Sequence, residues 1–571
     1  MNETNFRPWY PFYGDTKPNL DYYRGTIYEF LKETTEKYGA YYAFEFQGKK
    51  TTYDQFLFDV DHMALALHNL GIGKDDKVTI ALPNCPQGLV FFYALNKIGA
   101  ISNMIHPLSA EGEIEFYLNF SESKAIITLD QFYPKIKNIE EKCPTVKHII
   151  IATVKEELPW FKKLPYSLTL GRKLPKVDKN DEKVVFYSEL RRTGFKLPDF
   201  DFPKMGKDDT CSILYSGGTT GTAKGILLTN YNFNALSDQI IEMNQMFVPG
   251  DLFLSVMPIF HGFGLGIGIH TMLTKGGCCI LVPRFTPSSY CKLIKKYRPN
   301  FIAGVPTLFA AMLKEPSFQN ADLSCFKGVF SGGDSLSVEL KKKLDSFLEE
   351  HKSTIRVREG FGMTECVTAS CLTPLGEERE GSIGIPLSDM VYCICEPGTT
   401  KVLPPNTNGE ICIAGPTVMK GYLNNKEETD EILKVHDDGL TYIHSGDIGY
   451  QDIDGFVYYV QRLKRMIVTS GYNVYPSQIE NIIDSYDAVS MSCIIGVKDP
   501  IKMQKIKAFI VLKNGYTPSD EMKEEIMAYL KTKIAKYSLP YDIEFRESLP
   551  KTLVGKVAYR ILEEEEAKKA N

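Results

Sequence analysis

Short apolar runs alternate with helix-like segments along most of this chain, and this alternation limits its fold more than any other feature. Runs with the length of buried strands lie at residues 78–82, 101–105, 125–129 and 148–151. Segments with helical spacing lie between them, at 88–95 and 111–120. Short strands separated by helices predict a doubly wound parallel sheet.

A second alternating set begins near residue 211. Its predicted strands are 211–215, 252–257, 278–282, 301–305 and 329–331, and its predicted helices are 231–246, 287–297 and 336–349. Beyond residue 381 the apolar runs become short, with glycine and proline between them. This pattern is typical of an antiparallel, barrel-like lobe.

The pattern changes again near residue 461, where we place a domain boundary. The segments after it are predicted helices at 476–485 and 520–535 and predicted strands at 493–497 and 508–512. Four glutamates at 563–566 indicate a frayed, solvated tail. We therefore predict an α/β protein with an N-terminal domain over 1–460 and a small α/β C-terminal domain over 461–571.

Composition excludes several classes of protein. A net charge of −5 over 571 residues disfavours nucleic-acid binding, which normally requires a basic excess. The 13 cysteines lack paired C-x-x-C spacing, and Cys393 and Cys395 are interpreted as small buried hydrophobes on a strand. The first residues contain no apolar signal segment, and no apolar run reaches the ~18 residues of a membrane span. We expect a cytoplasmic protein with reduced thiols.

The alternation lapses between residues 153 and 207. This segment mixes Trp160 and other aromatic or apolar residues with Lys162, Lys163, Arg172 and Lys173. One interpretation is a solvated surface insertion. The other is weak contact with anionic lipid at the inner face of a membrane.

A glycine- and threonine-rich loop follows the predicted strand at 211–215. Glycines allow backbone N–H groups to point inward, and hydroxyls and a lysine add donors and charge, so the loop suits a polyphosphate. Its candidate ligands are Ser216, Gly217, Gly218, Thr219, Thr220, Gly221 and Lys224. It is not a Walker loop, because Ala223 precedes the lysine and Gly225 follows it. We expect a helical segment after the loop; the alternative is a flexible hairpin turn.

This loop resembles the phosphate-binding signature of the adenylate-forming superfamily, which includes acyl- and aryl-CoA synthetases, adenylation domains and luciferases. That signature ends in Pro-Lys-Gly, and Ala223 replaces its proline. The resemblance implies a large domain of two doubly wound αβαβα lobes plus a distorted β-barrel lobe, with a small, mobile α/β lid domain at the C-terminus. Further motifs follow in the family's order.

Residues 360–365, G-F-G-M-T-E, resemble the family motif at adenine and the α-phosphate. The resemblance implies that Gly360, Phe361 and Gly362 lie along the nucleotide, with Phe361 stacked on adenine, and that Thr364 contacts the α-phosphate. Glu365, with Thr219, would hold Mg²⁺ through the oxygen ligands that this ion prefers.

Residues 331–335, S-G-G-D-S, resemble the segment whose main chain passes adenine and one wall of the acyl pocket. The resemblance implies that Ser331 faces the acyl group and that Gly332, Gly333 and Asp334 face the nucleotide. An alternative for Asp334 is to cap the following helix.

Two motifs concern the ribose and the acid. Residues 445–450, S-G-D-I-G-Y, resemble the motif in which an aspartate, here Asp447, binds both ribose hydroxyls. Residues 258–264, P-I-F-H-G-F-G, carry Phe260 and His261 where amino-acid-activating relatives have an aspartate. His261 is thus expected beside the carboxylate of an acid without an α-amino group. The implied acyl pocket is Phe260, His261, Gly304, Val305 and Ser331.

The C-terminal part resembles the hinge and lid of the family. Arg462 would bind ribose, and Lys464 would be the pivot of the hinge. Ser470, Gly471 and Tyr472 would line the tunnel for the incoming thiol. Residues 549–560 resemble the motif of the catalytic lysine, which places Lys556 at the carboxylate and the α-phosphate.

Together these motifs imply an acyl-CoA synthetase that uses ATP, Mg²⁺ and coenzyme A. A carboxylic acid, most simply a medium- or long-chain fatty acid, would give acyl-AMP and pyrophosphate, and CoA would then displace AMP. Alternatives are an aryl-CoA ligase, a ligase that loads a carrier protein, and a non-catalytic nucleotide-binding relative. The sequence leaves open whether the protein is a monomer or a homodimer.

Overall fold

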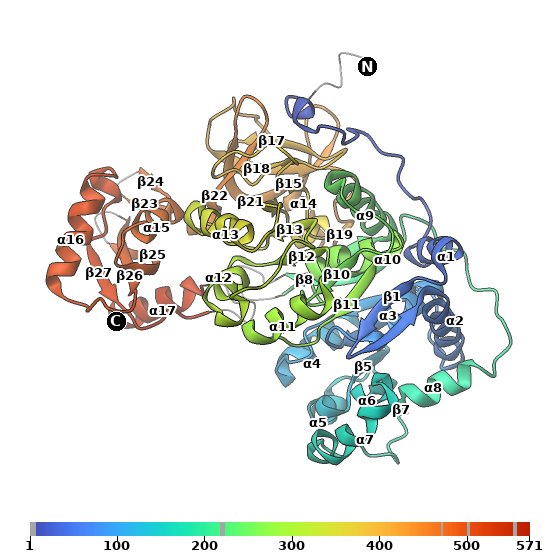
Figure 1. Ribbon diagram of the computed structural model, residues 1–571. Coiled ribbons are helices and arrows are strands. Elements are labelled where there is room, and N and C mark those ends of the chain that lie inside the picture. Colours follow the sequence, from blue (N-terminus) through green and yellow to red (C-terminus); the bar gives the residue numbers. More distant parts are fainter. Residues whose placement is uncertain (1–6, 217–222, 470–471, 500–502, 552–556, 571) are drawn as a thin grey trace.

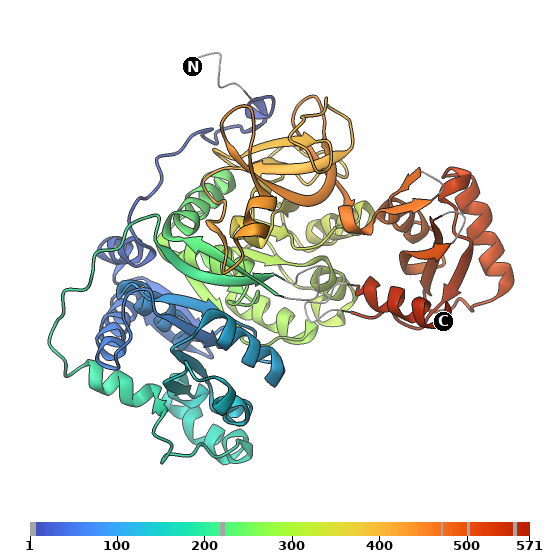
Figure 2. The same cartoon turned by 180° about the vertical axis from the view of Figure 1, so that it is seen from behind.

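The computed structural model describes residues 7–216, 223–469, 472–499, 503–551 and 557–570 (Figure 1). A large domain contains three sheets, and a small C-terminal domain lies at its side in both views (Figures 1 and 2). The predicted mixed α/β class is confirmed.

The first sheet has eight strands in the order β19-β9-β8-β4-β3-β5-β6-β7. Its parallel part consists of β3 (Lys77–Ala81), β4 (Ile101–Met104), β5 (Ala125–Leu129), β6 (His148–Ala152), β7 (Val184–Phe186) and β8 (Thr210–Ser216). Helices α3 (Pro86–Lys97) and α4 (Glu111–Ser121) form the connections between these strands. Every residue of β5 is buried, as expected for a parallel strand covered on both faces.

The second sheet has nine strands in the order β16-β15-β14-β13-β12-β10-β11-β1-β2. Its parallel centre is β10 (Leu252–Ser255), β11 (Cys278–Leu281), β12 (Phe301–Gly304), β13 (Gly328–Ser331) and β14 (Val357–Phe361). Helices α11 (Pro287–Tyr297), α12 (Pro306–Lys314) and α13 (Val338–Glu350) connect these strands. An N-terminal hairpin, β1 (Tyr42–Phe46) and β2 (Lys49–Thr52), extends the sheet through parallel pairing of β1 with β11. The sequence analysis did not anticipate this hairpin.

The third sheet is antiparallel, as the short, turn-rich strands predicted. It contains β17 (Val391–Cys395), β18 (Gly409–Ala414), β21 (Thr441–Gln451) and β20 (Leu433–Val435) in that order, with β22 (Val457–Arg462) paired to β21. Among the described strands it does not close into a barrel.

The segment at 153–207 is more regular than predicted. It contains α6 (Val154–Glu157), α7 (Trp160–Leu168), strand β7 at the edge of the first sheet, and α8 (Tyr187–Gly194). Strands and helices therefore continue to alternate through this segment, although their pattern in the sequence is weaker there. Within the described part of the chain, no helix has the length and apolar character that crossing a bilayer requires.

The small domain is built on the strands β23 (Ile467–Thr469), β24 (Tyr472–Val474), β25 (Val489–Asp499), β26 (Met503–Leu512) and β27 (Asp542–Phe545). Helices α15 (Pro476–Asp484), α16 (Asp520–Lys531) and α17 (Tyr559–Ala570) complete it. The predicted frayed tail is instead part of α17. The Lys507 amine lies 2.8 Å from Glu544 and 2.9 Å from Glu566, and these buried charges hold the helix to the sheet.

Candidate functional site

The predicted motifs converge on one large cavity of about 1480 Å³. Its wall contains residues from both doubly wound lobes, from the antiparallel sheet and from the small domain. The predicted residues in the lining are Ser216, Lys224, Phe260, His261, Val305, Ser331, Gly332, Gly333, Gly360, Phe361, Gly362, Thr364, Glu365, Arg462 and Lys464. Of the described motif residues, Gly304, Asp334 and Asp447 are not in the lining.

The glycine-rich loop joins two antiparallel strands. Strand β9 (Lys224–Thr229) pairs with β8, so that Ser216 lies opposite Lys224, and α9 (Asn230–Asn244) begins only afterwards. The predicted helix at 231–246 is confirmed as α9, but strand β9, which lies between the loop and this helix, was not predicted. Residues 217–222 lie outside the described residues, so the roles of Gly217, Gly218, Thr219, Thr220 and Gly221 stay predictions.

The position of Lys224 is set by two contacts across the cavity wall. Its amine pairs with the carboxylate of Glu428 on α14 (Lys426–Ile432), and it lies 5.0 Å from the centre of the Tyr422 ring. Its side chain is only 20% exposed. The lysine is thus a fixed cation at the polar end of the cavity, beside a short loop suited to phosphate.

Glu365 lies in the same corner. It follows β14 in a short 3₁₀ helix (Thr364–Cys366), is buried, and accepts a hydrogen bond of 2.9 Å from the Tyr422 hydroxyl. Burial and the Glu365 charge raise the pKa of Tyr422 far above its usual range, so this hydroxyl remains a donor. A buried carboxylate near a lysine can hold a hard cation against phosphate oxygens.

Tyr422 and Glu428 are site residues that the sequence analysis missed. Tyr422 belongs to β19 (Gly421–Tyr422), which pairs with β9 and so brings its ring beside Lys224. Neither residue lies in a recognisable motif. Only strand pairing and helix packing place them at the site.

Asp447 and Arg462 form a pair across two antiparallel strands. They lie opposite each other on β21 and β22, with Asp447 Oδ1 at 2.8 Å from Arg462 Nε. Asp447 is buried while the arginine side chain is about half exposed, and the charge of Asp447 raises the arginine pKa. Arg462 is the member of this pair that lines the cavity, and Ser445 and Gly446 also line its wall.

The S-G-G-D-S segment presents backbone to the cavity. Gly332 and Gly333 line it, and the positive φ of Gly333, 78°, is accessible mainly to glycine. Asp334 is exposed and accepts a hydrogen bond from the Ser335 amide. Ser337 is the residue that caps α13, so the alternative of a capping role for Asp334 was wrong.

An apolar branch extends from His261. The Phe260 and His261 rings lie 4.9 Å apart, and the π-helix η6 (Phe263–Thr271) follows them. The branch is bordered by Phe253 of β10 and Val256 just after that strand, and by Phe301 at the start of β12 and Val305 just after its end; on its other sides are Ile240, Ile267 and Met272. The cavity therefore runs from the carboxyl ends of parallel strands to their amino ends.

The small domain reaches the cavity at the hinge. Lys464 lies in a short helix (Leu463–Arg465) between β22 and β23, and Tyr559 of α17 also lines the wall. Ser470, Gly471 and Lys556 lie outside the described residues. Tyr472 begins β24, but its side chain is not described.

Comparisons with known proteins agree with this geometry. A family model described as "AMP-binding enzyme" matches residues 31–423, and one described as "AMP-binding enzyme C-terminal domain" matches residues 478–556. A long-chain-fatty-acid–CoA ligase of Bacillus subtilis is 34% identical over 98% of both chains. A protein of the same name from Escherichia coli is 30% identical over 97% of both.

Solved structures share the fold. A benzoate CoA ligase from Burkholderia xenovorans superposes with a TM-score of 0.79 at 22% identity, covering 94% of this chain and 99% of that one. A Mycobacterium tuberculosis fatty acyl CoA synthetase gives 0.69 at 24% identity, covering 95% and 99%.

Removing the Tyr422 hydroxyl tests the polar corner. Tyr422→Phe deletes the donor that orients Glu365, and loss of such a supporting bond weakens metal sites by ~10–100-fold. We expect the affinity for Mg²⁺–ATP, measured by calorimetry, to fall by about tenfold. The matched control is Tyr486→Phe, which removes a hydroxyl bonded to Glu525 on the surface of the small domain. Equal affinities of the two variants for Mg²⁺–ATP would show that the Tyr422 hydroxyl does not contribute to metal or nucleotide binding.

Proposed function

This chain belongs to the AMP-binding enzyme family, and from that premise we propose that it activates a long-chain fatty acid with ATP and transfers the acyl group to coenzyme A. The acid carboxylate attacks the α-phosphate, giving acyl-AMP and releasing pyrophosphate. The thiol of CoA then attacks the acyl carbonyl and AMP leaves. The observation that carries the proposal is that one cavity is lined both by the polar corner around Lys224 and Glu365 and by the apolar side chains of the branch.

The polar corner has groups suited to the first step. Lys224 would exchange its contact with Glu428 for phosphate oxygens, and Thr364 would contact the α-phosphate. Glu365, with Thr219, would hold Mg²⁺, which supplies charge neutralisation for the leaving pyrophosphate. Asp447 and Arg462, already fixed to each other at 2.8 Å, would bind the ribose hydroxyls. Because these charged groups are held in place before the reaction, less free energy is needed to reorganise them in the transition state.

The apolar branch is suited to a long acyl tail. Phe253 in β10 and Val256, the residue after β10, are separated by about 10 Å along an extended chain, and both line the cavity. His261 lines the same cavity, and the carboxylate would lie beside it. A benzoate would leave most of this apolar wall unfilled. The curated relatives that match this chain over nearly its whole length are likewise named for long-chain fatty acids.

Filling the far end of the branch tests the assignment of the substrate. Met272→Trp adds volume there, and overpacking a buried site costs about 1–3 kcal/mol. With palmitate, CoA and ATP we expect pyrophosphate release to fall about tenfold or more, while hexanoate is used as by the unmodified enzyme. Met246→Trp, the same change at an exposed position, is the control. Equal losses for both acids would contradict the location of the tail.

The unmodified enzyme decides between the proposed reaction and its alternatives. An acid panel from hexanoate to stearate together with benzoate is expected to favour the long chains; a preference for benzoate would indicate an aryl-CoA ligase. Product formation with free CoA is expected, and acceptance of a phosphopantetheinylated carrier protein alone would indicate a carrier-loading ligase. Absence of acid-dependent pyrophosphate exchange would indicate a non-catalytic relative.

Lys556 is proposed as the lysine of the adenylation step. Lys556→Ala is expected to slow acyl-AMP formation by ~10²–10³, about 3–4 kcal/mol, the scale for one preorganised charge-stabilising donor. Thioester formation from supplied acyl-AMP should be largely retained, because Ser470, Gly471 and Tyr472 are assigned to that step. Rapid-quench measurement of each half-reaction checks this. Equal losses in the two half-reactions would refute the division of roles.

We further propose that α7 contacts the membrane from which the fatty acid comes. Its Trp160 is 84% exposed, and Leu164 and Leu168 follow on the same helical face at 67% and 51%. Lys163 lies on this helix, and Arg172 and Lys173 follow it closely. An exposed apolar stripe beside basic residues suits anionic lipid.

Vesicle sedimentation tests this contact. The double variant Trp160→Glu/Leu164→Glu is expected to lose binding to vesicles containing phosphatidylglycerol, because it removes apolar contact and adds negative charge. Ile453→Glu, at another exposed apolar position, should bind as the unmodified protein does. Indistinguishable binding of the double variant and the control would refute the role of α7.

A further inference from the structure

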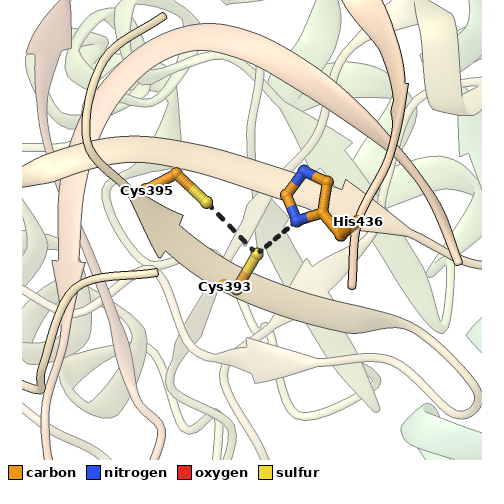
Figure 3. Close-up of side chains that lie close together, drawn as sticks. All are labelled: Cys393, Cys395 and His436. Atoms are coloured by element: carbon orange, nitrogen blue, oxygen red, sulfur yellow. Dashed lines mark hydrogen bonds between the residues drawn. The ribbon is translucent and has the colours of Figure 1, made fainter. Parts of the chain in front are cut away.

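One face of the antiparallel sheet gathers cysteines and histidines. Cys393 on β17 lies opposite Cys412 on β18, which in turn lies opposite His444 on β21, so strand register forms a row across three strands. Cys395 is two residues along β17 on the same face. His436, from the turn between β20 and β21, completes the group with Cys393 and Cys395 (Figure 3).

The distances within this cluster match those of ligands around a tetrahedral metal ion. Cys393 Sγ lies 3.7 Å from Cys395 Sγ and 3.8 Å from His436 Nδ1. With Zn–S near 2.3 Å and Zn–N near 2.05 Å, tetrahedral ligands are separated by about 3.8 Å for S–S and about 3.6 Å for S–N. Cys412 lies opposite Cys393 in the strand register and forms a second group of close ligand atoms with His436 and His444. Cys393, Cys395 and His436 therefore have the spacing of ligands in one shell, and Cys412 is the thiol on the neighbouring strand that can complete it.

Hydrogen bonds prepare His436 to act as a ligand. The Glu410 carboxylate lies 3.1 Å from His444 Nδ1, and His444 Nε2 lies 3.0 Å from His436 Nε2. If Glu410 accepts from His444 Nδ1–H, then His444 Nε2 accepts from His436 Nε2–H. The remaining nitrogen, His436 Nδ1, is unprotonated and faces Cys393. Ligand histidines in metal sites are usually oriented by a carboxylate, and here Glu410 acts on His436 through His444.

We propose that Cys393, Cys395, Cys412 and His436 bind a structural Zn²⁺ ion, with His444 and Glu410 as the supporting shell. Three thiolates and one imidazole form a closed tetrahedral set typical of structural zinc. A sulfur separation of 3.7 Å is far longer than the ~2.05 Å of a disulfide. The interpretation of Cys393 and Cys395 as small hydrophobes also leaves two buried imidazoles and a carboxylate on the same face unexplained.

The proposed ion would stabilise the wall of the large cavity. Glu410 also accepts a 2.9 Å hydrogen bond from the Gly446 amide, and Ser445 donates to the Ile411 carbonyl at 2.6 Å. Ser445 and Gly446 line the cavity immediately before Asp447 on β21. A metal that joins β17, β18 and the β20–β21 turn would therefore fix the start of β21. This inference does not depend on the substrate proposed above.

Metal analysis of the full-length protein tests the site. Purified without chelators, the protein is expected to hold about one zinc per chain by mass spectrometry, as one closed site requires. The zinc-free form, titrated with Co²⁺, should develop thiolate-to-cobalt charge-transfer bands and intense visible bands of tetrahedral cobalt. Absence of zinc together with absence of these bands would overturn the proposal.

Matched variants locate the ion. Cys393→Ser, at the least buried ligand, and His436→Gln should each lose zinc and the cobalt bands, whereas Cys325→Ser, a thiol in a distant loop, should retain both. Glu410→Gln keeps all ligands and should weaken zinc binding by ~10–100-fold. Circular dichroism verifies the fold of each variant. Zinc retained by folded Cys393→Ser and His436→Gln proteins would place the ion elsewhere and refute the assignment.

Discussion

The antiparallel pairing of β19 with β9 is the constraint on which the polar corner of the cavity depends. Gly421 and Tyr422 lie opposite Leu227 and Ile226, and the Leu423 amide donates to the Gly225 carbonyl at 2.7 Å. The Met419 amide donates to the Glu365 carbonyl at 2.8 Å. One short segment thus bonds to the strand that carries Lys224 and to the turn that carries Glu365. Backbone bonds of this kind fix positions that long side chains alone would leave variable.

The apolar part of the cavity follows from the parallel strands of the second sheet. Polar residues lie beyond the carboxyl ends of the strands, with His261 after β10 and Glu365 after β14, which is where open α/β sheets usually bind ligands. The strands themselves contribute Phe253, Phe301 and Phe330 to the lining, and the π-helix η6 contributes Phe263 and Ile267. Polar and apolar recognition therefore meet at the ends of the same strands, so a charged head and an apolar tail can be bound in one continuous space.

Much of this architecture could be predicted because parallel strands are buried on both faces. The runs at 125–129 and 148–151 are mostly apolar, and they became β5 and β6 with nearly the predicted ends. Strand β9 was missed, and the hairpin turn was only the alternative prediction, because Lys224 and Gly225 were assigned to the phosphate loop and the apolar residues after them to its exit. The hairpin strands β1 and β2 carry charged and polar residues, so their apolar signal is weak.

The site was predictable where a motif places several residues close in sequence, as at residues 360–365. It was not predictable where single residues from separate elements meet, as Tyr422 and Glu428 do at Lys224. The cysteine and histidine face is a further case. Its members lie on three strands and a turn, and only the register of the strands brings them together.

Two glycines of the π-helix differ in whether a larger residue can replace them. A methyl group on Gly264 would lie 2.1 Å from the Pro258 carbonyl oxygen, a backbone atom that cannot yield. On Gly268 it would meet the Phe253 ring at 3.5 Å, an ordinary contact. A larger residue can therefore be accommodated at position 268, beside the Phe253 ring that lines the cavity, but not at position 264. Changes in the width of the apolar branch among related sequences are then expected at position 268 and not at position 264.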